Sequence, residues 1–154
     1  MRYSPKGVPG ILHLWDGLMI CIYEVMTKKA LENRVALITG GGRGLGRAIS
    51  LGYAKEGARI VVCSRTESEV DETVSEILTI GGEAIGIAAD LTVAEESDRL
   101  MREIVAAYGQ LDLVFLNAGG QAGAREPIET VDSGAWVKTV EINLFTAFHV
   151  EKAA

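Results

Sequence analysis

Short apolar runs alternate with longer mixed stretches along the chain from residue 34 onward. Four of these runs are nearly continuous in apolar residues: Val35–Ile38, Ile60–Cys63, Ala84–Ala89 and Leu113–Leu116. Short runs of this kind are typical of parallel strands that are buried on both faces. The pattern therefore predicts four parallel strands.

The stretches between the runs repeat apolar residues at the spacing of a helix. Three inward faces are expected, formed by Leu45, Ala48, Ile49, Gly52 and Tyr53, by Val70, Val74, Ile77 and Leu78, and by Leu100, Met101, Ile104, Val105 and Tyr108. Gly57, Gly81-Gly82 and Gly109 follow these stretches, where a left-handed residue often ends a helix. A last helix is expected from about Asp132 to residue 154.

Strands and helices that alternate in this order predict an α/β fold. Right-handed crossovers place helices on both faces of an open parallel sheet, which gives a Rossmann-type doubly wound fold with three αβα layers. We expect residues 26–154 to form this domain, incomplete at its C-terminal end. Residues 1–25 are expected to be an irregular extension, because prolines and glycines interrupt every long element there: Pro5, Gly7, Pro9, Gly10 and Gly17.

Composition argues against several classes of function. The 154 residues are 48% hydrophobic and 23% charged, as in an ordinary globular protein with one core. A net charge of −6 argues against non-specific binding to nucleic acids, and the apolar segment Leu18–Tyr23 is too short to cross a membrane. Cys21 and Cys63 form neither a disulfide scaffold nor a Cys-x-x-Cys pair. We expect a cytoplasmic protein without a metal site, in which Cys63 fills the core.

A glycine-rich segment, Thr-Gly-Gly-Gly-Arg-Gly-Leu-Gly at 39–46, lies between the first expected strand and the first expected helix. Free backbone N–H groups and the positive end of the helix dipole converge at such a junction, which makes it an anion site. Glycine also lets a diphosphate approach the backbone. We predict a nucleotide site whose contacts here are Gly40, Gly42, Arg43, Gly44, Leu45 and Gly46.

Spacing distinguishes the kinds of nucleotide site. The common Gly-x-Gly-x-x-Gly pattern fits in no register. The phosphate loop of NTPases fits from Gly41 to Gly46, but Arg47 and Ala48 follow, and Ala48 has no hydroxyl for magnesium. The pattern Thr-Gly-x3-Gly-x-Gly does fit, and it resembles the short-chain dehydrogenase/reductase family. A plain glycine turn is the alternative, which other residues must exclude.

Ser64 and Arg65 follow the second apolar run, at the place where NAD-binding versions of the fold carry an acidic residue for the ribose hydroxyls. There is no carboxylate here. Arg65 and Arg43 instead offer two guanidinium groups to a 2′-phosphate. We therefore predict NADP(H), in preference to NAD(H), with Ser64 and Arg65 as cofactor-binding residues. Two solvated surface arginines are the alternative.

Asp90-Leu91, after the third run, resembles the pair that lies beside the adenine in this family. The alternative role for Asp90 is to cap the next helix, and Thr92 is also a good cap. Both roles are compatible with each other.

Asn117-Ala118-Gly119, after the fourth run, is similar to the family's Asn-Asn-Ala-Gly, with Leu116 in place of the first Asn. Asn117 is expected to donate hydrogen bonds across the carboxyl edge of the sheet and to form the floor of the cofactor crevice. A simple turn is the alternative.

Asn143, seven residues after Trp136 and followed by Leu144, resembles the family's Trp-x6-Asn-Leu. The resemblance implies a catalytic role for Asn143, in which it helps to carry a proton-relay water. A tolerated polar residue in a helix is the alternative. Together the matches cover residues 33–154.

The family's Tyr-x-x-x-Lys pair is absent, since Gly7, Thr27, Gly57 and Asp112 stand four positions after the four tyrosines. His13 and His149 are lone histidines in apolar settings, which are more often structural. The resemblance implies NADPH-linked carbonyl reduction or alcohol oxidation of a small molecule, 3-oxoacyl-reductase-like or similar, in a homo-oligomer when full length. The alternative is an inactive NADP(H)-binding fragment without the Ser, Tyr and Lys.

Overall fold

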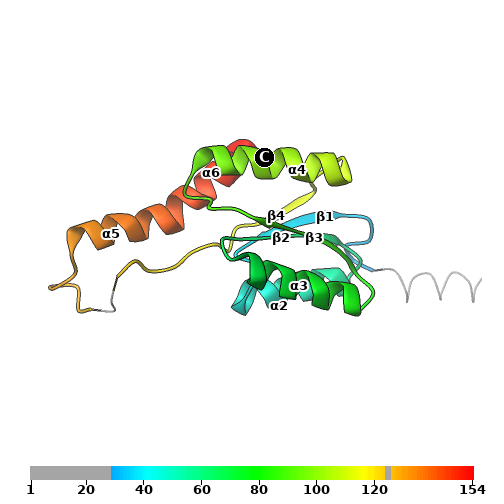
Figure 1. The fold of residues 1–154 in the computed structure, drawn as a ribbon, viewed down its shortest axis with the longest axis horizontal. Helices are drawn as coiled ribbons and strands as arrows, with labels where there is room; N and C mark the ends of the chain where they lie inside the picture. Colours follow the sequence, from blue (N-terminus) through cyan, green and yellow to red (C-terminus); the bar gives the residue numbers. More distant parts are fainter. Residues whose placement is uncertain (1–28, 124–125) are drawn as a thin grey trace, which may run out of the picture. The chain divides into compact units, whose positions relative to one another are not determined.

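The computed structural model describes residues 29–123 and 126–154 (Figure 1). The chain divides into two units, Met1–Ala30 and Leu31–Ala154. All of the described helices and strands belong to the second unit. The expected extension, residues 1–25, lies outside the described residues, and the division of the chain at residue 26 stays a prediction.

Four strands form one parallel sheet in the order β3-β2-β1-β4. They are β1 (Val35–Thr39), β2 (Arg59–Ser64), β3 (Glu83–Ala88) and β4 (Leu113–Phe115). Each corresponds to one predicted run, with ends that differ by at most one residue, which confirms the four strands. Because β2 and β4 lie on opposite sides of β1, the strand order reverses beside β1. In sheets of this type such a reversal opens a crevice at the carboxyl ends of the strands.

Helices cover both faces of the sheet, which confirms the three-layer α/β fold (Figure 1). The helices α2 (Gly44–Lys55) and α3 (Glu67–Thr79) lie on one face, and α4 (Ala94–Tyr108) and α6 (Thr146–Ala153) lie on the other. Alternate residues of a strand point to opposite faces. Accordingly one core cluster takes Leu37 and Val61 with residues of α4 and α6, and the other takes their strand neighbours with residues of α2 and α3.

The inward face of α2 differs from the expected one. Gly46, Ser50 and Ala54 are its buried residues, whereas Leu45 is 67% exposed. The cause is the close approach of the helix to the preceding turn, since a Cβ at position 46 would lie 2.2 Å from the Gly40 carbonyl oxygen. Small residues therefore face the sheet, and the prediction that Leu45, Ala48 and Gly52 are part of the inward face is wrong.

The inward faces of α3 and α4 agree better with the pattern. Val70 and Ile77 in α3, and Leu100 and Ile104 in α4, are buried as expected. Leu78 and Val105 are exposed, because each is one residue past a buried position and is rotated about 100° from it. Periodicity thus located both helices and the centre of each apolar stripe but not its edges.

Left-handed glycines end the first three helices as predicted. Gly57, Gly81 and Gly109 have φ angles of 86°, 77° and 74°. At the start of the last helical stretch, the Asp132 carboxylate accepts a hydrogen bond of 2.9 Å from the backbone N–H of Ala135. From there α5 (Ser133–Val140), a π-helical segment η1 (Glu141–Phe145) and α6 follow without a break, which confirms the expected helix.

Cys63 in β2 and Asp112, which directly precedes β4, stabilise the sheet in different ways. Cys63 is fully buried in β2, and burial raises the pKa of its thiol to about 12, so it is a neutral core residue as expected. The Asp112 carboxylate accepts hydrogen bonds of 2.8 Å from the backbone N–H of Val35 and from the Arg34 guanidinium. These bonds lower the pKa of Asp112 and join the starts of β1 and β4.

Candidate functional site

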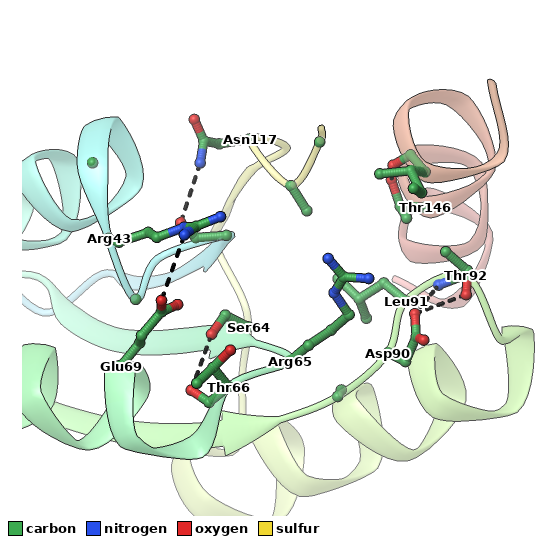
Figure 2. Close-up of a pocket in the computed structure, with 17 residues that line it drawn as sticks. Arg43, Ser64, Arg65, Thr66, Glu69, Asp90, Leu91, Thr92, Asn117 and Thr146 are labelled. Atoms are coloured by element: carbon green, nitrogen blue, oxygen red, sulfur yellow. Dashed lines mark hydrogen bonds and ion pairs between the residues drawn. The ribbon is translucent and has the colours of Figure 1, made fainter. Parts of the chain in front are cut away.

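The candidate site is a cavity of about 290 Å³ at the carboxyl ends of the strands (Figure 2). Four loops line it, namely the glycine turn after β1, the segment after β2, residues 89–92 after β3 and residues 117–119 after β4. Glu69 of α3, Ile142 of η1 and Thr146 of α6 complete the lining. The cavity thus occupies the crevice where the strand order reverses.

The structure brings most of the predicted cofactor residues together around this cavity. The predicted residues that line it are Gly40, Gly42, Arg43, Gly44, Ser64, Arg65, Asp90, Leu91, Asn117, Ala118 and Gly119. Leu45 and Gly46, in the first turn of α2, and Asn143, in η1, are not among the lining residues. The binding role of each residue stays a prediction, but their convergence from four separate loops agrees with one site.

The glycine turn presents the start of α2 to the cavity. Within the described part of the chain, no side chain caps this helix, so its first backbone N–H groups are available to an anion. Gly44 has a φ of 55°, a conformation that side chains rarely adopt, and a Cβ there would extend into open space. The turn is therefore shaped as a cradle for a negatively charged group.

Two guanidinium groups reach the cavity from different loops. Arg43 precedes α2, and Arg65 extends from the end of β2 toward residues 90–92 (Figure 2). Arg43 pairs loosely with Glu69, with a distance of 3.7 Å between Nη1 and Oε1. The Ser64 hydroxyl, between the two arginines, donates a hydrogen bond of 3.4 Å to the Thr66 carbonyl. Both cations therefore line the same cavity.

Asp90 organises the turn after β3 and does not cap α4. Its Oδ1 accepts hydrogen bonds from the Thr92 backbone N–H at 3.1 Å and from the Thr92 hydroxyl at 2.7 Å. The N-cap of α4 is Val93, which has no side-chain cap, so the capping role considered for Asp90 and Thr92 is wrong. The two bonds from Thr92 already satisfy Oδ1 of Asp90 within the turn. The helix α4 starts at Ala94, directly after its N-cap Val93.

The Asp90 carboxylate remains charged. Partial burial alone would raise its pKa, but the hydrogen bonds from Thr92 and the positive charge of Arg65 outweigh burial and lower it. Asp90 is therefore an anion beside Arg65 at the wall of the cavity.

Asn117 joins β1 to β4 at the base of the cavity, as the sequence led us to expect. Its Nδ2 donates to the carbonyl oxygens of Thr39 and Gly40 at 3.2 and 3.3 Å. The backbone N–H groups of Asn117 and Ala118 both donate to the Thr39 hydroxyl at 3.0 Å. The Thr39 hydroxyl in turn donates to the Phe115 carbonyl at 3.2 Å. This network holds the glycine turn and the Asn117 loop at a fixed separation.

Asn143 lies beside this loop, and its side chain is engaged with Gly120. Its Nδ2 donates to the carbonyl oxygens of Gly120 and Thr139 at 2.6 and 2.7 Å, and its Oδ1 accepts from the Gly120 backbone N–H at 3.2 Å. Asn143 also belongs to a π-helical segment, a distortion that is frequent at functional sites. In this arrangement the Asn143 amide fixes the segment that follows Gly119.

Sequence reasoning missed several residues of the site. In the sequence Thr39 stands out only as the first residue of the glycine-rich segment, yet it is 1% exposed and is the centre of the network with Asn117. Glu69, Thr66 and Thr146 line the cavity, and no motif singled them out. His149 contacts the site indirectly, because its Nδ1 lies 3.2 Å from the Leu91 carbonyl oxygen and connects α6 to the turn after β3.

The described residues contain no helix with enough length and apolar character to span a membrane. They also contain no cluster of three His, Cys, Asp or Glu side chains that could hold a metal ion.

Comparison with known sequences identifies the family. The short chain dehydrogenase family model matches residues 34–154. An uncharacterised oxidoreductase of Mycobacterium tuberculosis is 47% identical over 90 residues, which are 58% of this chain and 34% of that protein. A hydroxynaphthalene reductase-like protein of Metarhizium robertsii is 36% identical over 129 residues, 83% of this chain and 48% of that protein. The chain thus spans about half the length, or less, of these curated relatives.

Solved structures agree with this match. An NAD⁺-bound xylitol dehydrogenase superposes with a TM-score of 0.78 and 30% identity, over 81% of this chain and 48% of that one. A metagenomic short-chain oxidoreductase in complex with NADP superposes with a TM-score of 0.74 and 30% identity, over 80% of this chain and 55% of that one. The fold is a parallel α/β fold of the Rossmann type, and its crevice lies where sheets of this type bind dinucleotides. More narrowly, the chain belongs to the short-chain dehydrogenase/reductase family.

Proposed function

We propose that this chain is the NADP(H)-binding portion of an oxidoreductase that interconverts a carbonyl compound and an alcohol. The observation that carries the proposal is the meeting of Arg43 and Arg65 in one cavity with the uncapped start of α2. Family membership supports an oxidoreductase that uses a nicotinamide cofactor. The cofactor would supply hydride transfer, while the protein binds it, orients it and excludes water.

The residues of the cavity fit such a cofactor part by part. The start of α2 supplies backbone donors and a positive dipole end for the diphosphate. The Thr39–Asn117 network fixes the segments after β1 and β4, which line the crevice. Asp90 and Leu91 form the wall that the family resemblance assigns to the adenine.

Preference for NADPH over NADH rests on the two arginines. Neither residue 64 nor residue 65 is acidic, whereas Arg43 and Arg65 can both donate charge-assisted hydrogen bonds to a 2′-phosphate. The solved relatives bind NAD⁺ in one case and NADP in the other, so the cofactor follows from the residues of this chain and not from the fold.

The substrate proposal is limited to a small carbonyl compound or alcohol. The names of the relatives refer to hydroxynaphthalene and to xylitol, which have unrelated carbon skeletons. None of the four tyrosines in these 154 residues has a lysine four positions later, so the general acid implied by the resemblance is not among them. Cytoplasmic location and homo-oligomeric assembly of the whole enzyme belong to the same proposal.

Calorimetric titration with NADPH and NADH tests the cofactor assignment. A charge-assisted hydrogen bond contributes about 1.5–3 kcal/mol, so Arg65→Ala should weaken NADPH binding about tenfold or more and NADH binding little. Arg102→Ala is the matched control, because it removes the same charge from an exposed position in α4 away from the cavity. Equal losses for both cofactors in Arg65→Ala would refute the 2′-phosphate role.

A further inference from the structure

Glu69 lies directly against the glycine turn. It is in the first turn of α3 and lines the cavity together with Ser64 and Arg65 (Figure 2). A Cβ at position 42 would lie only 2.9 Å from the Cβ of Glu69, so Gly42 packs closely on this residue. The Thr73 hydroxyl, one turn further along α3, donates to the Gly42 carbonyl at 3.1 Å. The start of α3 is therefore fixed relative to the glycine turn.

Glu69 changes the charge of the cavity. The sequence showed no acid directly after β2, but the first turn of α3 carries this carboxylate to the same wall. Arg43 and Arg65 thus share the cavity with two acids, Glu69 and Asp90. The cavity therefore carries one carboxylate, that of Glu69, in addition to the Asp90 carboxylate expected from the sequence.

The pair between Arg43 and Glu69 faces water on the Arg43 side. The Arg43 side chain is 81% exposed and that of Glu69 is 31% exposed, and their charged atoms are 3.7 Å apart. An ion pair with this geometry is weak. A 2′-phosphate can therefore displace Glu69 from Arg43, but it must do so close to a carboxylate that repels it.

We propose that Glu69 is a specificity-determining residue that limits the preference for NADP(H). It holds Arg43 in the absence of a 2′-phosphate, opposes the phosphate by charge, and offers an acceptor to the hydroxyls of an unphosphorylated ribose. The inference rests on the proposed function and deepens it. Arg43 and Arg65 favour the phosphorylated cofactor, and Glu69 reduces the difference between the two cofactors.

Two adenosine nucleotides isolate this part of the site. Adenosine 2′,5′-bisphosphate and 5′-AMP differ only by the 2′-phosphate, so the ratio of their dissociation constants reports on its surroundings. In the full 154-residue chain, Glu69→Gln should tighten binding of the bisphosphate about threefold to fivefold, the range expected from a mostly exposed ion pair. Binding of 5′-AMP should stay the same or weaken.

Two comparisons separate this role from a general charge effect. Glu67→Gln removes the same charge from the same turn of α3, but Glu67 is not among the residues that line the cavity, and it should change the ratio by less than about twofold. In an Arg43→Ala background, Glu69→Gln should give a smaller gain, because its partner is absent. If Glu69→Gln does not fold, Glu69→Ala serves for the same measurements.

The possible outcomes distinguish the two proposals. A ratio that is unchanged in Glu69→Gln, or changed equally in Glu67→Gln, overturns the role of Glu69 and leaves the cofactor assignment standing. Failure of the folded wild-type chain to bind either nucleotide, NADPH or NADH overturns the proposed function, and the role of Glu69 with it. A selective gain for the bisphosphate in Glu69→Gln supports both.

Discussion

Replacement of Gly46 by alanine is the sharpest test of how the glycine turn is built. A methyl group at this position would lie 2.2 Å from the Gly40 carbonyl oxygen and 2.7 Å from Nδ2 of Asn117. Neither atom can move freely, since one is backbone and the other donates to the carbonyls of Thr39 and Gly40. The start of α2 must therefore shift away from the turn.

The size of the effect follows from two opposing contributions. Overpacking against a rigid backbone atom costs about 3 kcal/mol, at the upper end of the usual range. Replacement of a helical glycine by alanine returns about 1 kcal/mol. The net loss of about 2 kcal/mol should lower the melting temperature by roughly 5–10 °C for a unit of this size. NADPH affinity should fall as well, because the first N–H groups of α2 move.

Gly52→Ala is the matched control for this experiment. Gly52 is in the same helix, is exposed, and a Cβ there would meet no atom within 4 Å. We expect it to stabilise the protein by about 0.5–1 kcal/mol without a change in NADPH affinity. Circular dichroism melting and fluorescence titration measure both quantities. A Gly46→Ala protein that melts and binds NADPH like wild type would refute the packing argument.

Further predictions concern pH, the extension, solubility and activity. Because its hydrogen bonds lower the pKa of Asp112 in the folded state, its contribution to stability is present above the unfolded pKa and is lost as the pH falls through the folded value. Melting temperatures measured from pH 7 to pH 3 should fall less in Asp112→Asn than in wild type. Removal of residues 1–25 should leave the melting temperature and NADPH affinity unchanged; a fall of more than a few degrees would contradict this. Exposed apolar residues on the edge strand β4 and on α5 to α6, such as Val114 and Phe148, should make the 154-residue chain self-associate, and light scattering that shows a stable monomer would argue otherwise. The same chain should not oxidise NADPH with any ketone above a protein-free blank, and measurable turnover would disprove its inactivity.

Local sequence signals predicted the framework of the protein. Each apolar run became a strand, but only the central strands β1 and β2 are buried along most of their length as expected, whereas the edge strands β3 and β4 are largely accessible to solvent. Gly57, Gly81 and Gly109 ended helices, because their positive φ angles are a local requirement. These features depend on a few neighbouring residues, and one sequence is enough to recognise them.

Features that depend on contacts between distant segments were not predictable in the same way. Leu45 was misplaced because the rotation of α2 is set by the contact of Gly46 with Gly40. Thr39 gained its importance from Asn117, which lies 78 positions away. Glu69 entered the cavity only because α3 begins against the glycine turn. The positions of Arg43 and Arg65 could be recognised in the sequence. The place of the Glu69 carboxylate beside Arg43 could be found only from the tertiary structure.

An NMR titration of the isotope-labelled chain with NADPH tests the central claim most directly, because it reports on every backbone amide at once. We predict that NADPH shifts the amide signals of Gly44, Leu45 and Gly46 at the start of α2, together with those of Arg65 and Leu91. NADH should shift the first three and leave Arg65 less affected. Shifts confined to other surfaces, or none at millimolar NADPH with a folded spectrum, would contradict the assignment of this crevice as the NADP(H) site.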